Sequence, residues 1–210
     1  MLIDFIHRLR RPGAARRLPT LTAVVCLLLC VSTRAGEITA FELESQEDGY
    51  RLQARGLIDA PRDAVWRVLT DYPALHQVSP RIIESELVAV SPEGVARVRT
   101  LNRLCFLVFC RDLRHVQLIS EPGYGDFESY SVAAESDLSR GYARWRLHDR
   151  GDATRLDIDF EFAMDSYSWV PSLVSRIVVR SALKGDAEKL IEGIEHVVRL
   201  RDGRPDDRPP

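Results

Sequence analysis

Residues 60–80 read APRDAVWRVLTDYPALHQVSP, and this stretch joins two parts of the chain that carry different apolar patterns. Pro61 suits the first turn of a helix, with Asp59 or Ala60 near its cap. The helix continues through an apolar stripe made of Ala64, Val65, Val68 and Leu69. The segment 71–73 (Asp-Tyr-Pro) ends this helix, and a second short helix is predicted over 74–78.

Extended segments flank these two helices. Before them, 38–45 and 50–58 surround Asp48-Gly49, a dipeptide that favours a hairpin turn. After them the apolar period changes to two, which predicts strands. We expect these strands at 81–90, 94–110, 112–120, 126–134, 140–149 and 154–164.

The last element is a long helix, predicted over about 171–200. Its apolar stripe consists of Leu183, Ala187, Leu190, Ile194 and Val197, at spacings of four and three. Strands and helices that are segregated along the chain indicate an α+β fold. A single long helix must cover one face of a large sheet, so the sheet has to curl around it, and such an arrangement tends to leave a cavity.

Charge is distributed unevenly along the 210 residues, whose formal net charge is −2. The first 35 residues hold six arginines and one acidic residue, so the remainder carries 23 basic and 30 acidic side chains, a net charge of −7. An acidic body argues against nucleic acid as a partner. Any contact with a membrane is expected to be transient, and the sequence does not indicate an oligomeric state.

The N-terminal segment has the pattern of a secretory signal peptide. A basic region over 8–17 precedes an apolar run of 12 residues, 21–32, and Thr33 and Ala35 are small residues at the two recognition positions before Gly36. This run is short of the roughly 20 residues that span a bilayer. We therefore expect 1–35 to be a signal peptide, 36–200 an exported, periplasmic domain, and 201–210 a disordered tail; an uncleaved membrane anchor is the alternative.

Two cysteines, Cys105 and Cys110, lie in the predicted exported domain. They are five residues apart in what we interpret as one strand, so their side chains would point to opposite faces. A disulfide between them would need a bulge or bend. Two buried, unpaired thiols are the alternative, and the sequence leaves both open.

The pattern of charged residues along the predicted strand 94–110 indicates which of its two faces points inward. Arg97, Arg99 and Arg103 occupy odd positions, and charged side chains avoid burial. Thr100 and Asn102 are then polar groups on an otherwise apolar inner face. They either bond to neighbouring backbone or orient a ligand, because ligand pockets combine apolar walls with a few placed polar groups.

The last two predicted strands form a hairpin around Gly151-Asp152. Their register places Arg146 opposite Asp157 and Arg144 opposite Asp159 on one face. We interpret this ladder as a solvated ion-pair face and not as a catalytic cluster. The other face is wholly apolar and contains Trp145 and Ile158.

Strand parity and the first half of the long helix together predict a set of ligand-binding residues. The set is Val98, Thr100, Asn102, Leu104, Val116, Leu118, Trp145, Ile158, Phe160, Val174, Ile177 and Ser181. The sequence contains no recognisable metal-ligand spacing, Gly-rich phosphate loop or nucleophile elbow. We therefore assign no catalytic residue, no metal and no cofactor.

Several strings of this sequence resemble the START-like superfamily, in particular its polyketide cyclase and coenzyme Q-binding branch. They are Ala60-Pro61, the segment 64–72 (AVWRVLTDY), Pro80, the segment 141–145 (GYARW) and the terminal helix. The resemblance covers about residues 50–200. It implies a helix-grip fold: a curved antiparallel sheet wrapped around a long C-terminal helix, with two short helices after the first strand.

The resemblance implies three classes of function, because fold alone does not determine activity. The first is an exported protein that holds a hydrophobic small molecule, such as a lipid or quinone, in an internal cavity. The second is a cyclase or aromatase, for which Asp71, Asn102, Tyr130 and Arg180 are the groups to inspect. The third is a protein-interaction module. The export signal sets this chain apart from the quinone-binding branch.

Overall fold

The computed structural model describes residues 36–47, 49–106, 109–163 and 176–203. The predicted signal segment and most of the predicted tail lie outside the described residues. The strands are β1 (Glu37–Gln46), β2 (Gly49–Ile58), β3 (Ile82–Val90), β4 (Ala96–Phe106), β5 (Phe109–Gly123), β6 (Asp126–Ser131), β7 (Arg140–Asp149) and β8 (Thr154–Ala163). The helices are α2 (Arg62–Leu69), α3 (Arg176–Arg201) and the short 3-10 helices η1 (Tyr72–Gln77) and η2 (Ala133–Glu135).

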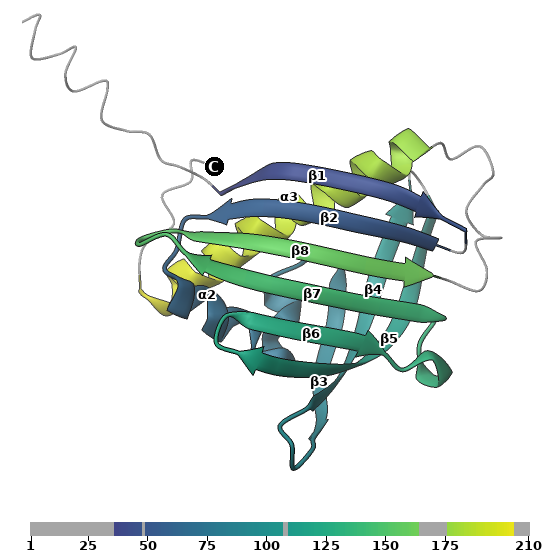
Figure 1. Cartoon of the computed structure of the whole chain (residues 1–210), viewed down its shortest axis with the longest axis horizontal. Coiled ribbons are helices and arrows are strands. Elements are labelled where there is room, and N and C mark those ends of the chain that lie inside the picture. Colours follow the sequence, from purple (N-terminus) through teal and green to yellow (C-terminus); the bar gives the residue numbers. More distant parts are fainter. Residues whose placement is uncertain (1–35, 48, 107–108, 164–175, 204–210) are drawn as a thin grey trace, which may run out of the picture. The chain divides into compact units, whose positions relative to one another are not determined.

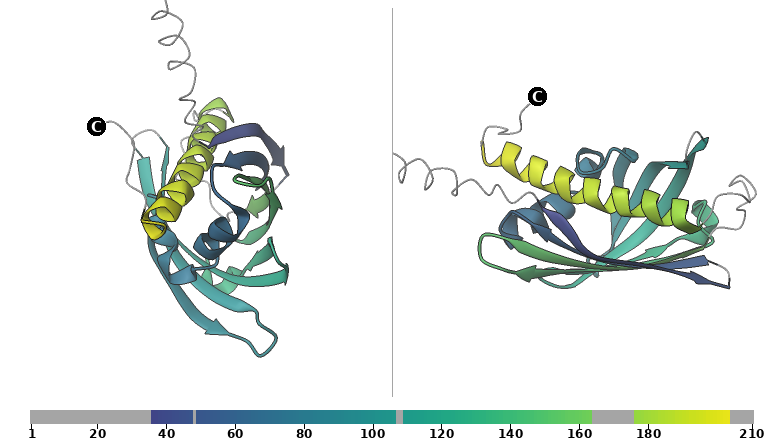
Figure 2. Two further views of the ribbon diagram at one scale, coloured as in Figure 1. Left: turned by 90° about the vertical axis from the view of Figure 1, so that its left-hand side faces the viewer. Right: turned by 90° about the horizontal axis from the view of Figure 1, so that it is seen from above.

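The eight strands form one antiparallel sheet in the order β1-β2-β8-β7-β6-β5-β4-β3 (Figure 1). The sheet curves, and α3 runs along its concave side, as the two further views show (Figure 2). This confirms the predicted helix-grip α+β fold. The two short helices, α2 and η1, follow the second strand, because β1 and β2 already form a complete hairpin.

The core lies between α2, α3 and the concave face of the sheet. Ile191 and Ile194 of α3 are almost fully buried, as are Val65 of α2, Ile58 of β2 and Leu156 of β8. Burying a side chain of this size contributes roughly 1.5–3 kcal/mol. The predicted stripe on the last helix is thus the surface that holds helix and sheet together.

Gly193 lets α3 approach the segment that follows η1. A Cβ at this position would overlap the backbone oxygen of Val78. Any other residue would therefore push the helix away from η1.

The hairpin between β4 and β5 differs from the prediction. Cys105 and Cys110 face each other on paired strands and form a disulfide, with their Cα atoms 4.0 Å apart. The prediction of one continuous strand over 94–110 is wrong, because the chain reverses between Phe106 and Phe109. Alternation continues through this apolar turn, and no Gly, Pro, Asn or Asp marks it.

Within the part of the chain that is described, no helix combines the length and the apolar character required to cross a bilayer.

Candidate functional site

A cavity of about 150 Å³ lies between the concave face of the sheet and the helices α2, η1 and α3. Its described lining residues come from nine parts of the chain that only the folded sheet brings together. They are Leu69, Tyr72, Leu75, Val78, Ile82, Thr100, Asn102, His115, Gln117, Ile119, Phe127, Ser129, Trp145 and Leu190.

One wall of the cavity is apolar. Leu69 ends α2, Leu75 lies in η1 and Leu190 projects from α3. Phe127 and Trp145, on neighbouring strands, stack with their ring centroids 5.3 Å apart. This wall offers a surface for an apolar or aromatic group, since stacked rings prefer such offset contacts.

A second part of the lining is polar; this polar wall comes from β4, β5 and the Ser129 end of β6. Asn102 Nδ2 donates a hydrogen bond to Thr100 Oγ1 at 2.8 Å, and Thr100 Oγ1 in turn donates to the backbone oxygen of His115 at 3.4 Å. Gln117 and Ser129 complete this wall. Thr100 and Ser129 are buried, being 3% and 7% exposed, so water satisfies little of their hydrogen-bonding capacity.

His115 is the histidine of this polar wall. Its Nε2 lies 2.7 Å from Ser131 Oγ. Burial lowers the pKa of His115 to about 4, because the desolvated ring favours the neutral form. At neutral pH this side chain therefore presents an uncharged imidazole to the cavity.

Tyr72 anchors η1 at the edge of the cavity. Its hydroxyl donates to Glu121 Oε1 at 2.6 Å, and its backbone oxygen accepts a hydrogen bond from Ser85 Oγ at 2.5 Å. Burial raises the pKa of Tyr72, and the hydrogen bond to Glu121 raises it further. The phenol therefore stays protonated, and its hydroxyl is already used by Glu121.

Three of the predicted pocket residues line the cavity: Thr100, Asn102 and Trp145. Val98 is fully buried on the same strand face. Leu104, Ile158 and Phe160 are half-buried, but they pack against a second apolar cluster formed by β1, β2 and α3. The alternation of side chains along each strand thus correctly predicted that all seven of these residues lie on the concave face. That face holds both the cavity and the second apolar cluster.

The inner-face prediction is wrong for Val116 and Leu118. Val116 lies opposite Arg99 and Leu118 opposite Arg97, so both side chains are on the convex face. The concave face of β5 instead carries His115, Gln117 and Ile119. The missed turn shifted the parity of this strand by one residue, which moves every side chain to the other face.

Of the three residues predicted for the last helix, Ser181 is the one whose side chain is described, and it does not line the cavity. Ser181 is exposed. Val174 and the side chain of Ile177 lie outside the described residues. Leu190, nine residues further along α3, lines the cavity.

One sequence signal points to the missed residues. The string Cys105-Phe106-Leu107-Val108-Phe109-Cys110 is nearly palindromic, as expected for a hairpin centred between residues 107 and 108. That centre places Thr100 opposite His115, which is the register that β4 and β5 have. No comparable local pattern in the sequence indicates that η1 and Leu190 line the cavity.

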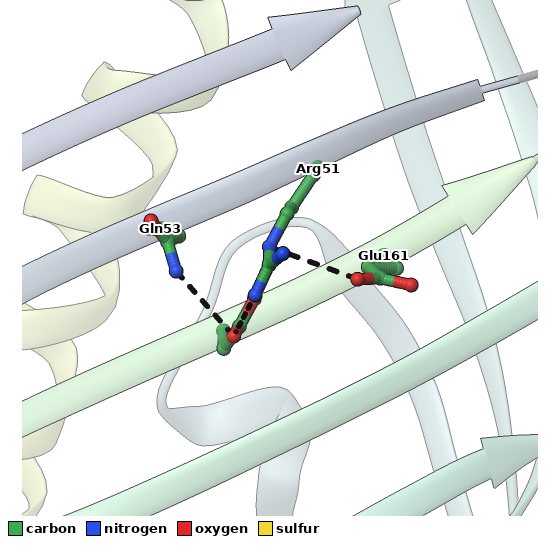
Figure 3. Close-up of polar contacts among 4 residues, drawn as sticks. Arg51, Gln53 and Glu161 are labelled. Carbon is green, nitrogen blue, oxygen red and sulfur yellow. Dashed lines mark hydrogen bonds and ion pairs between the residues drawn. The ribbon is translucent and has the colours of Figure 1, made fainter. Parts of the chain in front are cut away.

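The convex face carries the predicted ladder of charges. Arg146 faces Asp157 and Arg144 faces Asp159, as the hairpin register predicted. Arg51 of β2 donates two hydrogen bonds to Asp159, at 2.7 and 3.1 Å, and also pairs with Glu161 (Figure 3). These groups lie on the opposite side of the sheet from the cavity.

Of the four groups singled out for an enzyme, Asn102 is the one that lines the cavity. Asp71 pairs with Arg201 at 2.5 Å on the surface. Tyr130 is 52% exposed on the convex face, and Arg180 donates to the backbone oxygen of Phe41 at 2.8 Å. Among the described residues, no group of three or more His, Cys, Asp or Glu side chains is arranged to hold a metal ion.

Comparisons with known proteins agree with this architecture. Residues 51–199 match the family described as "Polyketide cyclase / dehydrase and lipid transport". None of the curated proteins matches the sequence.

Among solved structures, the fold is similar to that of TTHA0849 from Thermus thermophilus, with 20% identity, a TM-score of 0.59, and 72% of this chain and 98% of that chain covered. It is also similar to a START superfamily protein from Mycobacterium smegmatis, with 15% identity, a TM-score of 0.58 and the same two coverages. A third similar structure is the Zhui aromatase/cyclase from a Streptomyces strain, with 13% identity, a TM-score of 0.56, and coverages of 72% and 94%.

The family match covers well over half of the chain, and these structures share its sheet and its C-terminal helix. The chain therefore belongs to the polyketide cyclase / dehydrase and lipid transport family.

Proposed function

We propose that this protein is an exported binding protein that holds a hydrophobic small molecule in the cavity under α3. The carrying observation is the cavity itself, which is enclosed by the sheet on one side and by α2, η1 and α3 on the other. A space of about 150 Å³ accommodates a molecule or group of about the size of one aromatic ring. The stacked pair Phe127–Trp145 offers such a ring a matching surface.

The titratable groups of the described lining favour binding over catalysis. They are His115 and Tyr72, and each already has a hydrogen-bond partner. A general base works best with a pKa near the operating pH. The pKa of His115 lies at about 4, well below neutral pH.

Two observations support export to the periplasm. The segment 1–35 has the composition of a signal peptide. The disulfide between Cys105 and Cys110 is a feature of proteins in oxidising compartments. A cytosolic protein of this size would ordinarily keep two such thiols reduced.

The test is native mass spectrometry of the protein purified from its own cell envelope, followed by identification of whatever co-purifies. We expect a stoichiometric apolar molecule. Leu190→Trp should exclude it, because a larger side chain fills the cavity from α3. Leu200→Trp is the matched control, since Leu200 lies on the same helix and is 61% exposed.

Thermal unfolding shows whether each variant is folded, since overfilling a packed site typically costs about 1–3 kcal/mol. A folded Leu190→Trp protein that retains the molecule as well as Leu200→Trp would contradict binding in this cavity.

A further inference from the structure

The described wall of the cavity carries no formal charge. None of its 14 described lining residues is Asp, Glu, Lys or Arg, and His115 is neutral. An ionised ligand would have to leave water for this site without a counter-ion, which is strongly unfavourable. The wall therefore selects against carboxylates, phosphates and ammonium groups.

Two charged side chains that lie near lining residues in the chain pair with each other. Arg81 precedes the lining residue Ile82, and Asp186 lies one helical turn before Leu190. These two side chains form an ion pair with each other, and the Arg81 guanidinium also donates to the backbone oxygen of Arg103 at 3.3 Å. Glu121 accepts a hydrogen bond from the neutral Tyr72 hydroxyl, and its carboxylate would repel an anionic ligand. Neither side of the ion pair is left to neutralise a ligand.

The polar wall, in contrast, has unused hydrogen-bonding capacity. Ser129 is 7% exposed, and its hydroxyl has no hydrogen-bond partner among the described residues. The Gln117 side chain likewise has none within the described chain. Asn102 uses its amide nitrogen on Thr100, which leaves its carbonyl oxygen as an acceptor. These groups come from three adjacent strands and face one space.

A ligand that fills the cavity displaces water from these polar groups, which costs free energy unless the ligand itself supplies hydrogen-bond partners. A hydrocarbon of the right size would leave Ser129, Gln117 and the Asn102 carbonyl unsatisfied. A neutral hydroxyl or carbonyl group attached to a ring would satisfy them while the ring contacts Phe127, Trp145 and the leucines opposite.

We propose that the cavity binds an uncharged ring compound that carries a hydroxyl or carbonyl group, an inference that rests on the proposed binding function. The polar wall on β4, β5 and β6 binds that group. The apolar wall, which combines Phe127 and Trp145 of the sheet with leucines of α2, η1 and α3, binds the ring. Charged amphiphiles of the same size are excluded.

Three one-ring probes of similar size test this inference: phenol, toluene and benzoate, titrated separately into the disulfide-bonded protein at about pH 7.5 and followed by calorimetry. We expect phenol to bind roughly tenfold or more tightly than toluene, the factor that one buried hydrogen bond supplies. We expect no detectable binding of benzoate. Asn102→Leu should remove most of the preference for phenol over toluene while the protein remains folded, because the Asn102 side chain bonds only to Thr100 among the described groups.

Tyr130→Phe is the matched control. It removes an exposed hydroxyl on the convex face and should leave the preference unchanged. Toluene binding as tightly as phenol, or benzoate binding as tightly as either, would overturn the inference and leave the proposed binding function intact. Failure of all three probes to bind would contradict both.

Discussion

Glu195 of α3 accepts a hydrogen bond from the backbone N–H of Asp59, whose nitrogen lies 2.7 Å from Glu195 Oε1. The carboxylate is buried, with 3% of the residue exposed. Arg199, one turn along the helix, lies 3.9 Å from the other oxygen. This bond ties the segment between β2 and α2 to the C-terminal helix, and so it joins α2 and α3, two of the helices that enclose the cavity.

Glu195→Ala should lower the free energy of unfolding by about 1 kcal/mol, because it leaves the Asp59 N–H without its acceptor. Glu195→Gln should lower the free energy of unfolding by less, since the amide oxygen of glutamine can still accept this hydrogen bond. Urea unfolding at neutral pH measures both. Equal losses for the two variants would show that the bond to Asp59 does not account for the effect.

The proposed cleavage after Ala35 has a consequence for the same carboxylate. A Cβ on Gly36 would overlap Glu195 Oε1, so the backbone of Gly36 is in close contact with it. A chain that begins at Gly36 would bring its α-amino group beside Glu195. We expect that chain to be up to about 1 kcal/mol more stable than the same chain with an acetylated N-terminus.

This increase in the free energy of unfolding should be present at about pH 6. It should disappear as the pH rises above about 8, where the α-amino group of Gly36 loses its proton. Glu195→Gln should abolish the difference between free and acetylated chains. The intact mass of protein isolated from the periplasm tests the cleavage itself, and a mass that includes residues 1–35 would refute it.

The disulfide should contribute about 2 kcal/mol, the amount expected for closing so short a loop. Reductant should lower the unfolding free energy of the wild-type protein by this amount. It should have no effect on the double variant Cys105→Ser/Cys110→Ser. Cys110 is exposed, so alkylation of the oxidised, native protein by iodoacetamide would reveal free thiols and contradict the bond.

Asp159 should make the free energy of unfolding depend on pH in the acid range. The hydrogen bond from Arg51 holds the pKa of Asp159 below its ordinary value. A carboxyl group that is more acidic in the folded state stabilises the fold above its unfolded pKa of about 3.9, and this contribution is lost as the pH falls through the lower, folded value. Asp159→Asn should therefore be less stable than wild type at about pH 6, and the gap should close towards about pH 2.

The expected gap is below about 1 kcal/mol, because both partners are partly solvated. Urea unfolding across this pH range measures it. Asp152→Asn, which changes a carboxylate in an exposed turn, provides the comparison. A gap for Asp159→Asn that stays constant across the whole acid range would rule out the linkage.

Local patterns were sufficient where a turn signal or a long apolar period marked the element. Gly151-Asp152 placed the β7–β8 turn and hence the register of Trp145 with Ile158, which the structure confirms. The alternation of arginines correctly predicted the concave face of β4. The β7–β8 turn and the inner face of β4 both depend on residues that are close together in the chain. Backbone sterics and the alternation of side chains along a strand act over this short range.

The sequence by itself determined the order of elements, the α+β class, and the helix stripe that covers the sheet. Tertiary structure alone decided which face of β5 meets the cavity, because the apolar turn after Phe106 carries no local signal and a shift of one residue reverses a strand. It also decided that Leu75, Leu190 and Ser129 share one space. Such contacts join residues far apart in the chain, and they form only when the sheet, η1 and α3 pack together, with α3 in close contact with Val78 at Gly193.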